Sequence, residues 1–147
     1  MSLISPADAE RLKTTFAEMT RPVRLLFFTQ TLGCETCLQA RQILDELPVL
    51  SEKITIEEVN FILEKDKAAQ YGIDRVPALA LLTQDAAGAA RDTRIRFLGT
   101  PSGYEFVSLV QALMLAGGHT PQLTPANQAL VAAVTTPTTI QVFSTPT

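Results

Sequence analysis

Gly33-Cys34-Glu35-Thr36-Cys37 contains the only two cysteines of the 147-residue chain. The run before it, Val23-Arg24-Leu25-Leu26-Phe27-Phe28-Thr29, is mostly apolar and predicts a buried strand. After the second cysteine, apolar residues recur at the helical positions 37, 40, 44 and 47. The pattern therefore places the cysteines at a turn from a strand into a helix, with Cys34 at the helix cap and Cys37 one turn in.

A cysteine at the start of a helix is chemically activated. The unpaired N–H groups and the dipole at a helix N-terminus stabilise an anion, so Cys34 is expected to form a thiolate more readily than a free cysteine. A thiolate at Cys34 can attack a disulfide, and Cys37 is near enough to resolve the mixed disulfide. The spacing predicts a redox-active dithiol with Cys34 and Cys37 as its catalytic residues.

Two metal-binding alternatives would use the same cysteines. A zinc site needs four ligands, and beyond Cys34 and Cys37 the chain offers only the distant His119, which lies in a Gly-Gly-His loop. An iron–sulfur cluster needs four thiolates, which only two copies of the chain could supply together. The ligand count favours the dithiol, and we predict no metal and no cofactor besides the redox-active disulfide.

Composition limits the class of protein. Apolar residues make up 46% and charged residues 18% of the chain, as in a globular domain of ordinary size. The net charge of −3 argues against a nucleic-acid or anionic-membrane partner. No apolar run is long enough to cross a bilayer, and the first ten residues do not resemble a signal peptide. A cytoplasmic location is therefore expected, where a Cys-x-x-Cys pair is more often catalytic than structural.

Helical and strand patterns alternate along the chain. A strand, a helix and a second strand around the cysteines form a βαβ unit, whose two strands should be parallel and whose crossover should be right-handed. A second half of the β-β-α type follows. The expected helices cover 6–19, 34–47, 64–71 and 104–116, with Leu47-Pro48 as a stop signal and Phe106, Val107, Val110, Leu113 and Met114 facing inward in the last helix. The expected strands cover 23–29, 53–61, 78–82 and 93–97, the last as a half-buried edge strand.

Pro77 stands at the mouth of the expected strand 78–82, where it cannot donate to the sheet. One interpretation is a simple strand starter. The other is a cis Val76–Pro77 bond in a tight turn.

The order of these motifs resembles the thioredoxin/glutaredoxin superfamily. The segments Tyr71-Gly-Ile-Asp-Arg-Val-Pro77 and Phe97-Leu-Gly-Thr-Pro-Ser-Gly-Tyr-Glu-Phe106 resemble the glutaredoxin-like protein disulfide oxidoreductases, which join two thioredoxin folds. The N-terminal domain of bacterial alkyl hydroperoxide reductase flavoprotein is a related arrangement. The resemblance covers about residues 7–116.

The resemblance implies an α/β thioredoxin-like fold, with a four-stranded mixed sheet flanked by helices and an additional N-terminal helix. It also implies that Val76–Pro77 is cis and faces the dithiol. The backbone of Val76 would then bind the substrate chain, which makes Val76 and Pro77 the expected substrate-binding residues.

The end of the sequence repeats its beginning. Thr20-Arg21-Pro22 with Phe28-Thr29 recurs as Thr135-Thr136-Pro137 with Phe143-Ser144. A helix over 128–134 is expected before Thr135-Thr136-Pro137, and a strand over 138–143 is expected after it. We therefore expect a thioredoxin-like domain over 1–118, and over 119–147 a linker, a helix and the first strand of a truncated second unit. The alternative is a degenerate C-terminal extension.

Two carboxylates are candidates for tuning the dithiol. Glu35 lies between the cysteines, where its charge opposes thiolate formation and makes the couple more reducing; alternatively, it is an ordinary acid at a helix start. Glu58 shares a strand face with Ile54 and Ile56 and could accept a proton from Cys37 if that face is buried. The alternative for Glu58 is a solvated face. Asp74 and Arg75 could flank the substrate groove or form a surface ion pair of little energetic weight.

The leading functional hypothesis is a thiol–disulfide oxidoreductase that acts on protein or small-molecule disulfides. The expected electron donor is a thioredoxin reductase-like flavoprotein, and a homodimer through the C-terminal segment is a further expectation. Two alternatives remain. One is a redox-silent docking or assembly domain of a two-unit protein, and the other is a glutathione-dependent glutaredoxin, for which a basic cluster to bind the tripeptide is missing.

Overall fold

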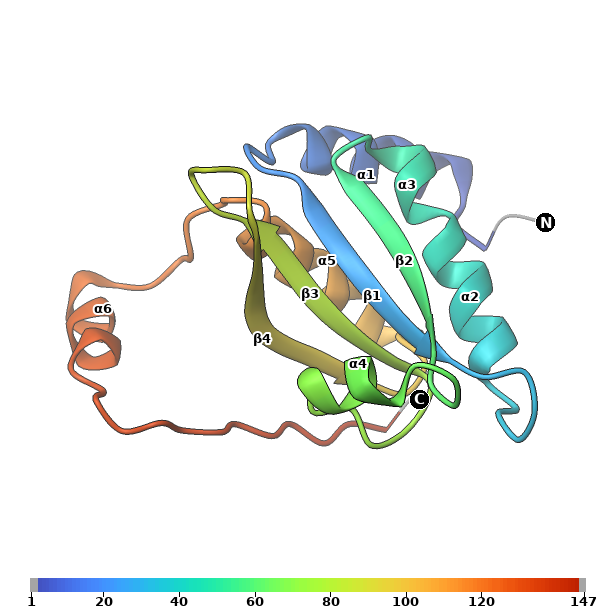
Figure 1. Cartoon of the computed structure of the whole chain (residues 1–147). Helices are drawn as coiled ribbons and strands as arrows, with labels where there is room; N and C mark the ends of the chain where they lie inside the picture. Colours follow the sequence, from blue (N-terminus) through green and yellow to red (C-terminus); the bar gives the residue numbers. More distant parts are fainter. Residues whose placement is uncertain (1–2, 146–147) are drawn as a thin grey trace.

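A four-stranded mixed sheet with the strand order β2-β1-β3-β4 forms the centre of the chain (Figure 1). The computed structural model describes residues 3–145. β1 pairs parallel with β2 and antiparallel with β3, and β3 pairs antiparallel with β4. The parallel βαβ unit and the β-β-α half that follows it are therefore confirmed. The strands are β1 (Val23–Thr29), β2 (Ile54–Asn60), β3 (Ala78–Gln84) and β4 (Ala90–Leu98).

Helices cover both faces of this sheet. One face packs against α1, α2, α3 and α5, and the opposite face packs against the short α4 (Figure 1). The helices are α1 (Pro6–Ala17), α2 (Cys37–Asp45), α3 (Leu47–Leu50), α4 (Lys65–Gln70), α5 (Tyr104–Ala116) and α6 (Pro125–Ala132). No helix within the described residues 3–145 has the length and apolar character needed to cross a membrane.

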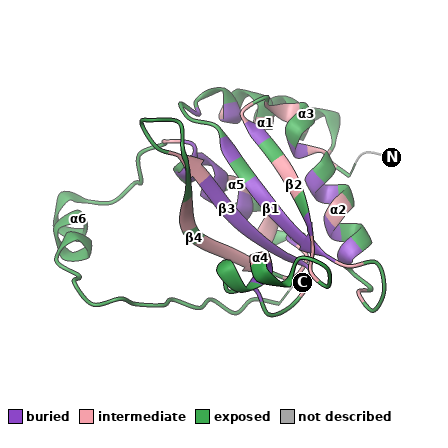
Figure 2. Ribbon diagram, in the orientation of Figure 1, coloured by how far each residue is buried: buried purple, intermediate pink, exposed green. Residues whose placement is uncertain are grey.

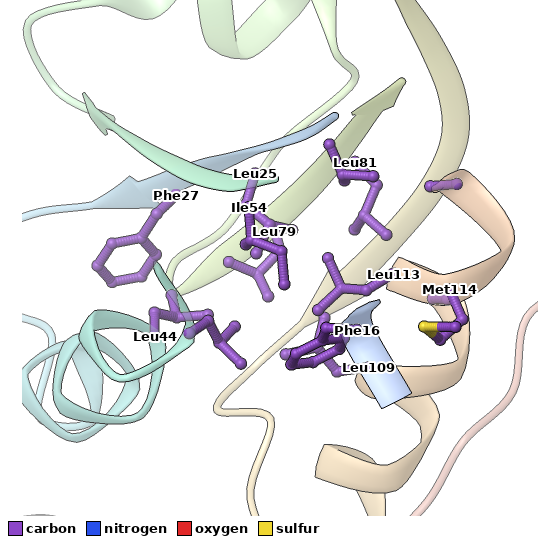
Figure 3. Packing of buried hydrophobic residues seen from close by; sticks show 14 of the residues in the cluster. Phe16, Leu25, Phe27, Leu44, Ile54, Leu79, Leu81, Leu109, Leu113 and Met114 are labelled. Atoms are coloured by element: carbon purple, nitrogen blue, oxygen red, sulfur yellow. The ribbon is translucent and has the colours of Figure 1, made fainter. Parts of the chain in front are cut away.

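Successive side chains of β1 point to opposite faces of the sheet, and the core is divided into two clusters accordingly. Leu25 and Phe27 point to the face of α2 and α5, where Figure 3 shows them among Phe16, Leu44 and Leu113. Leu26 and Phe28 point to the face of α4. Because β1 is buried on both faces, its sequence is nearly continuous in apolar residues, as is usual for a central strand.

The expected stop at Leu47-Pro48 is confirmed, because α2 ends at Asp45 with Glu46 as its C-cap; Pro48 lies in the first turn of the separate helix α3, where a proline needs no N–H partner. Two other sequence expectations about helices need correction. The cap of α2 is Thr36 rather than Cys34, and the helix begins at Cys37, because Ala40 N–H donates the first helical hydrogen bond to Thr36 O (3.0 Å). Val107 does not face inward and is 56% exposed.

The buried stripe of α5 consists of Leu109, Ala112, Leu113 and Ala116, which follow the spacing i, i+3, i+4, i+7, together with Met114. Leu109 was therefore missed, although its helical spacing from Leu113 and Ala116 was visible in the sequence.

Residues 119–145 lie outside this core. Their helix, α6, begins at Pro125 behind the N-cap Thr124, earlier than expected, and none of its side chains is buried (Figure 2). The expected strand over 138–143 is wrong, because these residues pair with no strand of the sheet and are exposed. That 119–147 begin a second unit stays a prediction.

Candidate redox site

The loop between β1 and α2 is shaped by two local features. Gly33 has φ +73°, a left-handed conformation that glycine adopts without the steric cost of a Cβ. The Gln30 side-chain amide donates to the Leu32 carbonyl (2.8 Å), which closes the loop before Cys34. Together they turn the chain from the end of β1 into the start of α2.

Cys34 and Cys37 form a disulfide, with an S–S distance of 1.96 Å and a Cα–Cα distance of 5.5 Å. This confirms that the two cysteines lie within bonding distance. Cys34 is half-buried, whereas Cys37 is only 5% exposed. A partner can therefore reach Cys34 more easily than Cys37.

The start of α2 has no side-chain cap. Thr36 is its N-cap and makes no capping hydrogen bond through its side chain. The first N–H groups of a helix have no partner within the helix, so those of α2 are available to a thiolate at the adjacent cysteines.

The Val76–Pro77 peptide bond is cis, as the resemblance implied. Pro77 is buried and Val76 is half-buried. The next residue, Ala78, pairs with Phe28 near the end of β1, so Pro77 lies at the same end of the sheet as the disulfide loop. Direct packing of Pro77 on the disulfide stays a prediction.

Thr100 lies in the segment that connects the disulfide loop to the cis-proline, and the sequence patterns did not identify it. Its hydroxyl donates to the carbonyl of Thr36, the residue before Cys37, at 3.3 Å. The neighbouring Gly99 N–H donates to the Pro77 carbonyl at 2.8 Å. The Gly99–Thr100 segment therefore contacts both the disulfide loop and the cis-proline. The Gly-Thr-Pro-Ser-Gly run marked a loop, but its contact across 64 residues of sequence depends on the fold.

The two predicted tuning carboxylates lie in different surroundings. Glu35 is exposed in the disulfide loop and precedes the N-cap Thr36, so the alternative of an acid in the first turn of the helix is wrong. Glu58 is exposed, and its carboxylate pairs with the Arg41 guanidinium of α2. This is the placement expected for the solvated alternative, and a proton-accepting role for Glu58 stays a prediction.

Asp74 and Arg75 form an exposed ion pair (2.7 Å), which is the second of the two alternatives expected for them. The hydrogen bond from the Arg75 guanidinium lowers the pKa of Asp74 from its ordinary value. His119 lies beside Glu18, with 3.8 Å between His119 Nδ1 and Glu18 Oε2. Across residues 3–145 there is no group of three or more His, Cys, Asp or Glu side chains arranged to hold a metal ion.

Exposed apolar side chains lie at the disulfide end of the sheet. Leu32 precedes Cys34 by two residues and is 84% exposed. Leu63 follows the end of β2, which runs parallel to β1, and is 81% exposed. Single exposed apolar residues are common on surfaces, but these two lie at the end of the sheet that a partner of Cys34 would approach.

The sheet order, the disulfide at the start of α2 and the cis-proline opposite β1 define a thioredoxin-like domain. The chain resembles the N-terminal domain of the alkyl hydroperoxide reductase AhpF and archaeal protein disulfide oxidoreductase units. No family model matches it.

Three comparisons carry this resemblance. The solved N-terminal domain of alkyl hydroperoxide reductase AhpF from Enterococcus faecalis has a TM-score of 0.77 and 34% identity, covering 88% of this chain and 60% of that one. A protein disulfide oxidoreductase from Aeropyrum pernix shares the fold with a TM-score of 0.70 and 24% identity, covering 88% of this chain and 54% of that one. The curated AhpF protein of Xanthomonas campestris is 32% identical over 115 residues, which are 77% of this chain and 18% of that protein. The chain thus spans less than a fifth of the curated relative.

Proposed function

We propose that the chain is a thiol–disulfide oxidoreductase module that uses Cys34 and Cys37. In the reduced form, the Cys34 thiolate attacks a partner disulfide and releases one partner thiolate, leaving a mixed disulfide. The Cys37 thiolate then attacks the Cys34 sulfur and releases the second partner thiolate. Two electrons pass from the dithiol to the partner, and the Cys34–Cys37 disulfide is formed; the reverse sequence oxidises a partner dithiol.

The observation that carries this proposal is the unequal burial of two bonded cysteines at an uncapped helix start. The half-buried Cys34 is accessible to a partner, and the buried Cys37 is protected from other thiols until the mixed disulfide forms. The helix N-terminus favours the thiolate that the first step needs.

The surroundings of Cys34 support a protein disulfide as substrate. The backbone of Val76 is proposed to pair with an extended substrate chain beside Pro77, which would hold the partner disulfide against Cys34. The exposed Leu32 and Leu63 would add apolar contact at the same end of the sheet. A small disulfide could contact the Val76 backbone but would not reach Leu32 and Leu63 as well.

A flavoprotein of the thioredoxin reductase type is the proposed electron donor. The Xanthomonas relative is part of an alkyl hydroperoxide reductase, and its matched segment is 18% of its length. A dithiol domain matched to one part of a longer reductase chain is consistent with a carrier that passes electrons between a reductase and a disulfide substrate.

Insulin reduction by dithiothreitol tests the proposed activity. The chain should accelerate the reaction, Cys34→Ser should abolish the acceleration, and Cys37→Ser should abolish it while forming a mixed disulfide with insulin that mass spectrometry detects. Cys34→Ser should trap no such adduct, because the resolving cysteine is buried. Turnover by Cys34→Ser equal to the parent chain would instead support the redox-silent docking alternative, and turnover only with glutathione would support the glutaredoxin alternative.

A further inference from the structure

A groove of about 600 Å³ lies at the end of the sheet opposite the disulfide. It is bounded by the C-terminal end of α5 and by the β3–β4 hairpin, which Figure 1 shows beside each other. Thr83 and Arg91 pair in its wall, and Thr83 also pairs with Val23 at the start of β1. Because β1 has seven residues, this end of the sheet is about 20 Å from the disulfide end. A ligand in the groove would not contact Cys34.

The side chains of three arginines in the groove form no hydrogen bond or ion pair with any residue that the structure describes. The chain has 12 lysines and arginines in all, and its net charge is −3. Within residues 3–145, no hydrogen bond or ion pair engages the side chains of Arg21, Arg91, Arg94 and Lys65, and the first three of these line the groove. The remaining cationic side chains are Arg11, Lys13, Arg24, Arg41, Lys67, Arg75 and Arg96, which form ion pairs, and Lys53, which donates to the Met19 carbonyl.

The backbone of β4 is irregular where it carries Arg94. Between the pairs Ala80–Arg96 and Leu82–Asp92 the register shifts, which marks a bulge. Arg94 lies in this bulge with φ +65° and is the only residue other than glycine in the left-handed region among residues 3–145. Bulges often redirect a side chain at a functional site, and a strained backbone conformation at a non-glycine residue also points to a function.

The acidic group of the groove is already neutralised. Both Asp92 oxygens accept hydrogen bonds from the Arg96 guanidinium (2.8 and 2.7 Å), and Asp92 Oδ1 also accepts from the Arg94 N–H (2.8 Å). The Asp92 carboxylate thus hydrogen-bonds the Arg96 guanidinium and interacts only through its charge with the Arg94 guanidinium, and the guanidinium groups of Arg21, Arg91 and Arg94, which line the same groove, keep their hydrogen-bond donors free of it. The Thr83 and Thr93 hydroxyls donate to backbone carbonyls (2.6 and 2.8 Å), so the arginines are the side-chain donors available to a ligand.

From the three unpartnered arginines and the bulge that presents Arg94, we infer that this groove binds a multivalent oxyanion, of the phosphate-ester or polycarboxylate class. Guanidinium groups donate in a planar fork that matches phosphate and carboxylate oxygens. The groove volume falls in the range of small-molecule sites. Because the site and the disulfide lie at opposite ends of the sheet, the anion is a separate ligand and not a thiol–disulfide substrate.

Titration with inorganic pyrophosphate and with citrate tests this inference, on the full chain and at constant ionic strength set with NaCl. Calorimetry should give saturable 1:1 binding, and amide NMR shifts should be largest at 93–95 and near Arg21. Tighter binding of pyrophosphate assigns the phosphate class, and tighter binding of citrate assigns the polycarboxylate class. Arg91→Gln and Arg94→Gln should each weaken the better ligand by about tenfold, as for the loss of a charge-assisted hydrogen bond.

Lys65→Gln is the matched control, because it removes the unpartnered cation that lies outside the groove, on α4. It should leave both affinities unchanged. The side chains of Lys65, Arg91 and Arg94 are all exposed, so circular dichroism should show that the three variants fold. Absence of saturation with both anions, or an equal loss of affinity in Lys65→Gln, overturns the inference. So does much tighter binding of a heptaglutamate peptide, which would indicate docking of an acidic protein segment.

Discussion

The two cysteines are the same residue type, and their surroundings give them different roles. Cys34 follows Gly33, whose φ is +73°, in an exposed loop, whereas Cys37 is the first residue of α2 and is buried. Cys34 is therefore the cysteine that can react with a partner disulfide or thiol. The N-terminus of α2 favours the Cys34 thiolate, and charged side chains nearby change how readily that thiolate forms.

Glu35 is expected to disfavour that thiolate. Replacing it with glutamine removes a negative charge from the loop between the cysteines, so the thiolate should form at lower pH and the reduced dithiol should be more stable. The reduction potential should rise by up to about 30 mV, equivalent to about 1.4 kcal/mol for two electrons. Because Glu35 is exposed, solvent screening makes this an upper limit.

Iodoacetamide trapping as a function of pH measures the thiolate, and equilibration with glutathione measures the potential. Glu52→Gln is a matched control, since Glu52 is exposed in the turn before β2. Identical pH profiles for Glu35→Gln and the parent chain would show that Glu35 does not tune the dithiol.

Thr100 is expected to position the disulfide loop. In the disulfide form its hydroxyl holds the Thr36 carbonyl, so Thr100→Val should destabilise that form relative to the dithiol. A hydrogen bond of about 0.5–1.5 kcal/mol corresponds to a rise of about 10–30 mV in the reduction potential. Thr100→Ser keeps the hydroxyl and should restore the parent potential. Equal potentials for the serine and valine variants would show that the hydroxyl has no such role.

At the scale of elements, local patterns predicted most of the fold. β1 was evident from its apolar run, and α5 from its helical spacing up to Gly117. The contact of Thr100 with Thr36 and the bulge of β4 could not be predicted, because both depend on pairing between distant segments. The strand over 138–143 failed for a related reason: its pattern suits a strand, but a strand also needs a partner.

Arg96 connects β4 to the end of α4. Its guanidinium donates to the Tyr71 carbonyl (3.0 Å), lies over the Tyr71 ring and holds Asp92. The Arg96 hydrogen bonds lower the pKa of Asp92 below its ordinary value of 3.8, while partial burial acts in the opposite direction. The pair thus links the edge strand to the segment that leads towards Pro77.

Asp92→Asn should therefore destabilise the domain in a pH-dependent way. Since the pKa of Asp92 is lower in the folded than in the unfolded chain, its contribution is complete above pH 3.8 and is lost as the pH falls through the folded value. Urea unfolding should show a difference on the order of 1 kcal/mol between parent and variant at pH 7. The difference should shrink below about pH 4. A difference that is constant from pH 7 to pH 2 would contradict this assignment.

At the scale of the whole molecule, a packed body and an unpacked segment differ sharply. Both core clusters are built from residues between Phe16 and Ala116. Beyond Gly118 every described residue is exposed (Figure 2). Six large apolar side chains in this segment are more than half exposed, namely Leu130, Val131, Val134, Ile140, Val142 and Phe143. Such a surface favours contact with another chain.

A chain ending at Gly118 should therefore keep its stability and lose its tendency to associate. The thermal midpoint should stay within about 2 °C of the full chain, because no buried side chain is removed. In size-exclusion chromatography the full chain should elute earlier as its concentration rises, whereas the shortened chain should elute as a monomer at every concentration. The prediction of a homodimer through the C-terminal segment depends on this difference. Monomeric elution of both chains would exclude it, and a large fall in the thermal midpoint would show that the segment packs on the domain.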